Sequence, residues 1–135
     1  MTATGDARQA LYTMLALSID DAVAHVSAHQ PDEVATPAVW IDVARRRAND
    51  DGVGLVVTLP VVAVVDGADR AQLDALDRIG DLIWQAAGEV GAPRSDEPYD
   101  LDVGGPRLRA LTTYVDVDVF ADTLCPTPIT MEAAR

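Results

Sequence analysis

Residues 55–65, LVVTLPVVAVV, form the stretch that decides the fold of this chain. Successive side chains of an extended strand point to opposite faces of a sheet, and apolar residues occupy both sets of alternate positions here. This pattern is typical of a central strand that is covered on both faces. Pro60 cannot donate a ladder hydrogen bond, which predicts a bulge or a locally unpaired edge near the middle. We therefore expect a strand over residues 53–65 that needs cover from two sides.

The segments next to this strand predict an antiparallel partner and a helix. Residues 38–48 open with the β-branched and aromatic run AVWIDV, and the turn sequence NDDG that follows predicts antiparallel pairing with 53–65. After the strand, Asp69 and Gln72 have the spacing of a capping box. They predict a helix over residues 70–87 that ends at Gly88 or Gly91. Its apolar stripe consists of Leu73, Leu76, Gly80, Ile83 and Ala87.

A second hairpin is expected after the helix. The sequence APRSDEP at 92–98 is interpreted as a loop. Residues 99–103 then alternate between apolar and polar, GG at 104–105 provides a tight turn, and residues 107–120 run back.

Charge pairs support the register of this hairpin. With the two glycines as turn residues, Asp102 lies opposite Arg107 and Asp100 lies opposite Arg109. Apolar and charged residues exchange faces near Ala110, so either a bulge lies there or the hairpin tip projects beyond the core. We favour the projecting hairpin.

The remaining segments complete an α+β domain. Residues 6–17 have the spacing of a helix with Asp6 as its N-cap, whereas residues 18–30 do not distinguish a helical turn from an edge strand. The expected fold is an antiparallel or mixed sheet of about four strands with a long helix packed on one face, an N-terminal helix and a projecting hairpin. Residues 1–122 are expected to form this single domain, and 123–135 a flexible C-terminal tail.

The composition limits the function. Against 10 basic side chains stand 22 acidic ones, and the net charge of -12 argues against binding to the outside of duplex DNA. Cys125 is the sole cysteine, which excludes an internal disulfide and a cysteine-based zinc site. The N-terminus lacks the basic start of a signal peptide, and the apolar run at 53–65 is too short to span a bilayer. We expect a soluble intracellular product.

Catalysis is not predicted. Ser, Cys and His fall into no nucleophile motif, and phosphate-loop and metalloprotease motifs are absent from the sequence, so we expect no enzyme and no cofactor. One metal hypothesis concerns the Asp-x-Asp strands, because hard cations take oxygen ligands. The favoured interpretation is that these carboxylates face solvent and that two of them pair with arginines. They are Asp100, Asp102, Asp116 and Asp118.

The basic cluster RRR at 45–47 has two interpretations. The simpler one is a solvated strand end that pairs locally with Asp50 and Asp51; the functional one is a contact with an acidic protein neighbour. Tyr114 is an aromatic interface candidate, whereas Trp40 is expected in the core. The interface candidates are Arg45, Arg46, Arg47, Asp100, Asp102, Arg107, Arg109 and Tyr114.

The order of elements carries a resemblance over residues 7–120. An N-terminal helix precedes the strand TPAVWIDV; the apolar strand then ends in DGAD, one helix follows, and SDEPYDLDVGG leads to a final TTYVDVDVF. This order resembles the tail terminator proteins of long-tailed bacteriophages, which are also called tail completion or head-tail joining proteins. The similarity lies in the pattern of elements and not in a diagnostic motif.

The resemblance implies a small structural subunit of the virion that forms a hexameric ring, caps the tail tube and joins it to the head or neck. The implied partners are further copies of the chain, the tail tube protein and a head-tail connector or stopper, and DNA passes through without specific binding. The strand with two apolar faces fits this idea, because one helix covers one face and a neighbouring subunit would cover the other. The alternatives are another neck protein such as a connector or stopper, a small metal-binding enzyme, and a monomeric ligand-binding domain.

Overall fold

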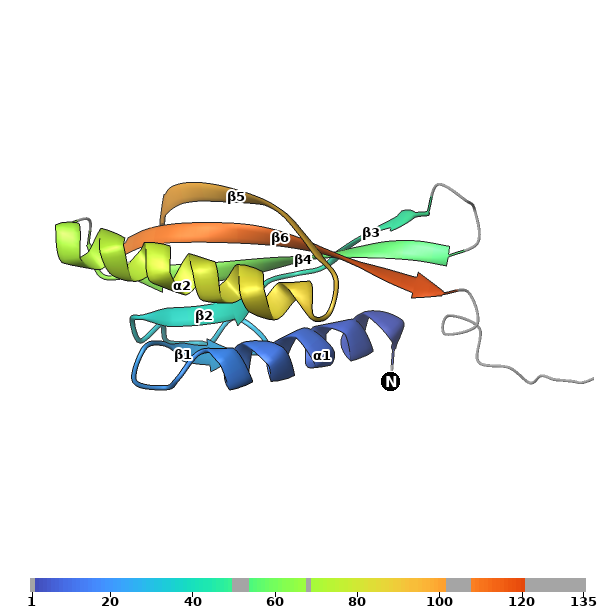
Figure 1. Cartoon of the computed structure of the whole chain (residues 1–135), viewed down its shortest axis with the longest axis horizontal. Coiled ribbons are helices and arrows are strands. Elements are labelled where there is room, and N and C mark those ends of the chain that lie inside the picture. The colour runs from blue at the N-terminus through green and yellow to red at the C-terminus, as the bar shows by residue number, and fades with distance from the viewer. Residues whose placement is uncertain (1, 50–53, 68, 102–107, 121–135) are drawn as a thin grey trace, which may run out of the picture.

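The computed structural model describes residues 2–49, 54–67, 69–101 and 108–120, which form a mixed sheet of six strands and two helices (Figure 1). The α+β class is therefore confirmed, with six strands in place of the expected four. Among the described residues, no helix combines the length and apolar content of a membrane span. The elements are α1 (Ala3–Ser18), β1 (His25–Ser27), β2 (Ala38–Ile41), β3 (Arg45–Ala48), β4 (Gly54–Val65), α2 (Arg70–Gly88), β5 (Ala92–Leu101) and β6 (Leu108–Phe120).

The sheet is organised around β4. Its strands lie in the order β1-β2-β4-β6-β5, and β3 pairs with β4 on the same side as β2. Among the described pairings, β1 with β2 is parallel and the others are antiparallel. The strand expected over 38–48 is thus two strands, which pair with different halves of β4. The undecided region 18–30 contains the short edge strand β1.

The break between β2 and β3 lies at Pro60. β2 pairs with β4 from Val61 onward, β3 pairs with it up to Thr58, and the Pro60 carbonyl accepts a hydrogen bond of 2.7 Å from the Asp42 N–H. On the other side, β4 pairs with β6 without a register shift. Of the two outcomes predicted for this proline, the locally unpaired edge is therefore confirmed, because its missing donor faces the gap between the two shorter strands.

β4 is buried on both faces, as its sequence predicts. Val57 belongs to the core under the two helices, whereas Val64 and Trp40 belong to a cluster on the opposite face, against which Val34 and Tyr99 pack. Trp40 is 2% exposed, so its predicted place in the core is confirmed. The second face is thus covered within the chain by the connection before β2 and by β5. The expectation that a neighbouring subunit must supply this cover is wrong.

The two helices begin at capped residues. Asp69 caps α2, since its carboxylate accepts a hydrogen bond of 3.0 Å from the Gln72 N–H, which confirms that prediction. The predicted cap of α1 is wrong: Thr2 is the N-cap, with its hydroxyl 2.9 Å from the Gly5 N–H, and Asp6 lies in the first turn. The Thr2 hydroxyl accepts a hydrogen bond from a free amide of the first turn, so the helix begins at Ala3, before Asp6.

Residues 92–98 form most of β5 and not the loop that their prolines suggested. β5 is the edge strand beside β6, and its register shifts between Pro93 and Ser95, which marks a bulge. An edge strand tolerates proline because one of its sides has no ladder to complete. Pro93 and Pro98 are therefore compatible with a strand at this position.

One end of the sheet extends past α2 (Figure 1). This sheet arm consists of β3, the start of β4 and the end of β6, and the first turns of α1 lie beneath it. At the other end, Arg109 pairs with both Asp100 and Val65, so the predicted register of the second hairpin is confirmed there. The predicted tip at 102–107 and the tail at 123–135 lie outside the described residues.

Candidate functional site

Arginine side chains line a groove on the sheet face that points away from both helices. The groove has a volume of about 600 Å³ and adjoins a second hollow of about 410 Å³ that shares Arg45, Glu97 and Tyr114 with it. We call the first hollow the arginine groove. Its lining residues are Arg45, Arg46, Arg47, Thr58, Arg94, Ser95, Glu97 and Tyr114.

The strand register explains why these side chains meet. Arg45 lies opposite Thr58 on β4, and Thr58 lies opposite Asp116 on β6, so the three residues form one row across the sheet. Residues paired across neighbouring strands point to the same face of the sheet. Val57 points toward the helices, so this row points to the other face. β3 therefore forms one wall of the groove, β5 forms the other, and β4 with β6 form the floor.

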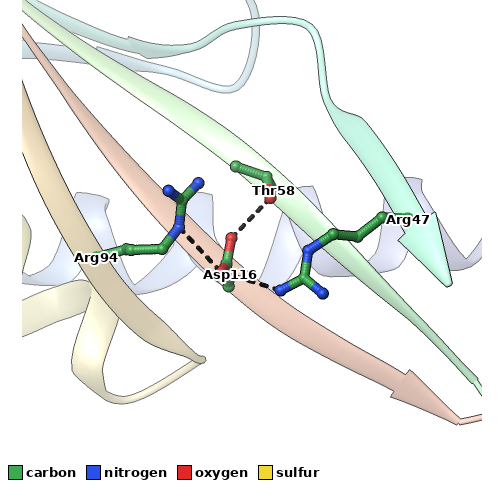
Figure 2. Close-up of polar contacts among 4 residues, drawn as sticks. All are labelled: Arg47, Thr58, Arg94 and Asp116. Atoms are coloured by element: carbon green, nitrogen blue, oxygen red, sulfur yellow. Dashed lines mark hydrogen bonds and ion pairs between the residues drawn. The ribbon is translucent and has the colours of Figure 1, made fainter. Parts of the chain in front are cut away.

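Asp116 joins the floor to both walls (Figure 2). The Thr58 hydroxyl donates a hydrogen bond of 2.6 Å to its Oδ1, and the Arg94 Nε donates one of 3.0 Å to its Oδ2. The Arg47 guanidinium lies 3.7 Å from the same oxygen. The Asp116 side chain is only 17% exposed, and a charge with so little contact to water needs partners. The two arginines and the Thr58 hydroxyl provide them. This carboxylate holds the arginines of opposite walls in place.

Removal of the Asp116 carboxylate should loosen the arginine groove. In Asp116→Ala the Thr58 hydroxyl loses its acceptor and two arginines lose their common partner, so we expect the free energy of unfolding to fall by about 1–2 kcal/mol. Urea denaturation measures this change. The matched control is Asp118→Ala, which removes an exposed carboxylate from the same face of the same strand. Equal losses in the two variants would contradict the role of Asp116.

Tyr114 occupies the groove between Arg94 and Glu97. Its hydroxyl donates a hydrogen bond of 3.0 Å to Glu97, and the Arg94 guanidinium carbon lies 5.7 Å from its ring centroid. Burial, followed by the hydrogen bond and charge of Glu97, raises the pKa of Tyr114, while Arg45 opposes the shift. The phenol is thus held as a hydrogen-bond donor in the arginine groove.

Titration of Tyr114 should reveal its link to Glu97. Because the folded protein keeps the phenol protonated to higher pH than the unfolded chain does, stability should fall as the pH rises through the ordinary tyrosine pKa. Absorbance at high pH follows tyrosinate formation, and Tyr114→Phe should remove the step at the highest pH. Glu97→Gln should shift that step to lower pH. A Glu97→Gln curve that coincides with the wild-type curve would refute the link.

The groove is basic within an acidic protein. All ten basic side chains of the chain are arginines, and four of them line this groove. Arg45 makes no ion pair among the residues that the structure describes, and Arg47 remains 56% exposed beside Asp116. Guanidinium groups present several donors in a fixed plane and bind carboxylates in pairs of hydrogen bonds. The groove is therefore suited to an anionic partner.

The predicted interface residues form two separate groups. One group lines the groove and consists of Arg45, Arg46, Arg47 and Tyr114. In the other group, Asp100 pairs with Arg109 at 2.9 Å near the opposite end of β6. Arg109 and Asp116 are seven residue steps apart, which is about 23 Å of strand. Asp102 and Arg107 lie outside the described residues.

The Asp-x-Asp strands do not gather carboxylates in the described part of the chain. Asp100 lies on β5 opposite Arg109, near the start of β6, whereas Asp116 lies in the second half of β6, and each is paired with arginine. Within the described residues, no three His, Cys, Asp or Glu side chains approach one another closely enough to hold a metal. The predicted pairing of Asp100 with Arg109 is confirmed. Asp116 was expected to face solvent, but it pairs with Arg94 and Arg47 and its side chain is 17% exposed.

Sequence reasoning missed the β5 wall of the groove. Arg94 and Glu97 lie in the segment interpreted as a loop, so no pattern placed them opposite β3. Asp96, from the same segment, accepts hydrogen bonds of 2.7 Å each from the Trp84 indole and the Thr113 hydroxyl, and so fixes β5 to α2 and β6. No alternation marks this strand in the sequence, because Ser95, Asp96 and Glu97 are consecutive polar residues and the flanking prolines favour a loop.

No protein-family model matches this chain, and no curated protein matches it significantly. The arginine groove and the order of elements are therefore the features from which a function can be argued.

Proposed function

We propose that this chain is a structural subunit of a bacteriophage virion, a tail terminator that forms a hexameric ring, caps the tail tube and joins it to the head or neck. It acts without catalysis or a cofactor. Further copies of the chain, the tail tube protein and a connector or stopper are its partners, and DNA passes through the ring without specific binding.

The observation that carries the proposal is the arginine groove on a chain of net charge -12. Its position on an open sheet face, with Asp116 bracing both walls, favours a macromolecular partner that presents carboxylates. Opposite charges at such a surface guide association and select the partner more than they add affinity. A protein that must assemble with acidic copies of itself has use for such a surface.

The order of elements also supports the proposal. The order is the one on which the resemblance rests: an N-terminal helix, short strands after a proline-containing connection, the long apolar β4, one capped helix and a final pair of long strands. The β4 face that points away from the helices gives no support to a subunit contact, because Val34 and Tyr99 of the same chain pack against it. The sheet arm provides a second surface that extends past α2 (Figure 1).

Electron microscopy of tail tubes tests the proposal. Tubes assembled from the tail tube protein of the same virion are mixed with the purified chain, and we expect a sixfold ring at one end of each tube. The tubes should also stop growing when the chain is present. Binding to a connector complex without binding to tubes would instead identify another neck protein, and a chain that binds neither would refute the proposal.

A further inference from the structure

We propose that the arginine groove receives helix α2 of a neighbouring copy of this chain, with Asp77 and Asp81 of that helix facing Arg45 and Arg47. This inference rests on the proposed ring and specifies how its subunits contact one another. The closing experiment separates failure of this contact from failure of the ring.

The outer surface of α2 carries the acidic residues that the groove requires. Asp74, Asp77 and Asp81 are exposed and lie within one side of the helix, because their spacing of three and four residues returns to the same face. Arg78 lies at the flank of this row and has the spacing of an i,i+4 partner for Asp74. Among the described residues, neither Asp77 nor Asp81 takes part in a side-chain hydrogen bond or an ion pair, so both are available to a partner.

The spacings of the two surfaces agree. Asp77 and Asp81 are about 6 Å apart along a helix axis. Arg45 and Arg47 are about 6.6 Å apart along β3 and share one side of that strand. The two walls are separated by three strand spacings, about 14 Å between backbones, and a helix with its side chains is about 10–12 Å wide. One helix thus fits between β3 and β5 above the floor.

Apolar side chains occur beside the charges on both surfaces. Leu73 and Trp84 are each 37% exposed and bracket the acidic row of α2. Val43 is 78% exposed and lines the hollow that adjoins the arginine groove. Large apolar groups next to complementary charges are typical of the anchors of a protein interface. The two surfaces therefore complement each other in more than charge.

The opposite positions of these surfaces dictate the kind of assembly. α2 packs on the face of the sheet with Val57, and the groove lies on the other face. A contact between them joins the front of one subunit to the back of the next, which is a heterologous contact and closes into a ring when the rotation permits. An α2-to-groove contact is thus the geometry that a ring of identical subunits needs.

Charge reversal in two complementary variants tests the contact. One variant is Arg45→Glu with Arg47→Glu, and the other is Asp77→Arg with Asp81→Arg. Native mass spectrometry and electron microscopy, with tail tubes present, measure ring formation. Each variant alone places like charges at every contact, so we expect ring formation to require at least about tenfold more protein than in the wild type. The control Asp32→Arg with Glu33→Arg makes the same change in net charge as the helix variant, at exposed residues elsewhere, and should form rings normally.

An equal mixture of the two variants should restore the ring. The reversed groove then meets the reversed helix, and the unchanged groove meets the unchanged helix, so the ring contains the two variants alternately. Circular dichroism verifies that each variant is folded; the helix variant changes only exposed side chains and retains its test if the groove variant unfolds.

Four results would overturn the inference. Normal rings from either variant alone, or a mixture of folded variants that forms none, would refute this contact while leaving a wild-type ring, and with it the proposed function, intact. A groove variant that forms rings but loses affinity for duplex DNA would assign the groove to a nucleic acid. Absence of rings in the wild type would refute both proposals.

Discussion

Replacement of Arg8 by methionine should lower the free energy of unfolding by about 3 kcal/mol, a large fraction of the stability of a small domain. The Arg8 guanidinium donates hydrogen bonds to the carbonyls of Ala28 at 2.9 Å, Ile41 at 2.6 Å and Asp42 at 2.9 Å. Ile41 is the last residue of β2, Asp42 follows it, and Ala28 follows β1. One side chain of α1 thus satisfies three acceptors and fixes the helix to the strand ends.

The loss should come from the missing donors and not from the missing charge. Burial lowers the pKa of Arg8 from its usual range, with the Asp42 carboxylate opposing the shift, yet an arginine so placed stays charged at neutral pH. Arg8→Lys keeps the charge but cannot span three acceptors, so we expect it to be intermediate. Arg70→Met, on the exposed surface of α2, is the matched control and should change stability by less than about 0.5 kcal/mol. Equal chemical denaturation of Arg8→Met and the wild type would disprove the clamp.

The second large effect is expected from Gly91→Ala, which should cost about 2–3 kcal/mol. A methyl group at this position would overlap the backbone carbonyl oxygen of Asp116 and would lie 3.1 Å from a methyl of Val117. Backbone cannot yield as a side chain end can, so the turn between α2 and β5 must move away from β6. Because Asp116 anchors both walls of the arginine groove, the same shift should disturb the groove.

Thermal denaturation compares Gly91→Ala with a nearby control. Gly88→Ala adds the same methyl group at the last residue of α2, where nothing lies within 4 Å. We expect it to be neutral or to stabilise the helix by up to about 1 kcal/mol. A Gly91→Ala protein as stable as the Gly88→Ala protein would show that the turn is free to move.

Much of the fold follows from patterns that act over a few residues. The two apolar faces of β4, the Asp69 cap of α2 and the pairing of Asp100 with Arg109 were all predicted, because each depends on local periodicity or on a tight turn. Thr2 was missed as a cap because Asp6 offered an equally suitable oxygen nearby. β5 was missed because its prolines are acceptable only at a sheet edge, and the order of strands is not a local property.

The candidate site could be predicted only in part for the same reason. The run 45–47 is conspicuous in the sequence, and Tyr114 was recognised as an outward-facing aromatic. Their proximity depends on the register between β3, β4 and β6, which brings residues 45, 58 and 116 into one row. The opposite wall, with Arg94 and Glu97, required the placement of β5. Likewise, the cover over Val64 depends on Val34, which lies in an irregular connection.

The uninterrupted pairing of β4 with β6 has a mechanical consequence. β2 and β3 are separated at Pro60, whereas β4 and β6 run together from the helix-covered body into the sheet arm without a register shift. A force along these strands loads their ladder in shear, so that many hydrogen bonds share it at once and do not open one after another. We therefore expect the arm and the body of the sheet to resist bending as one unit.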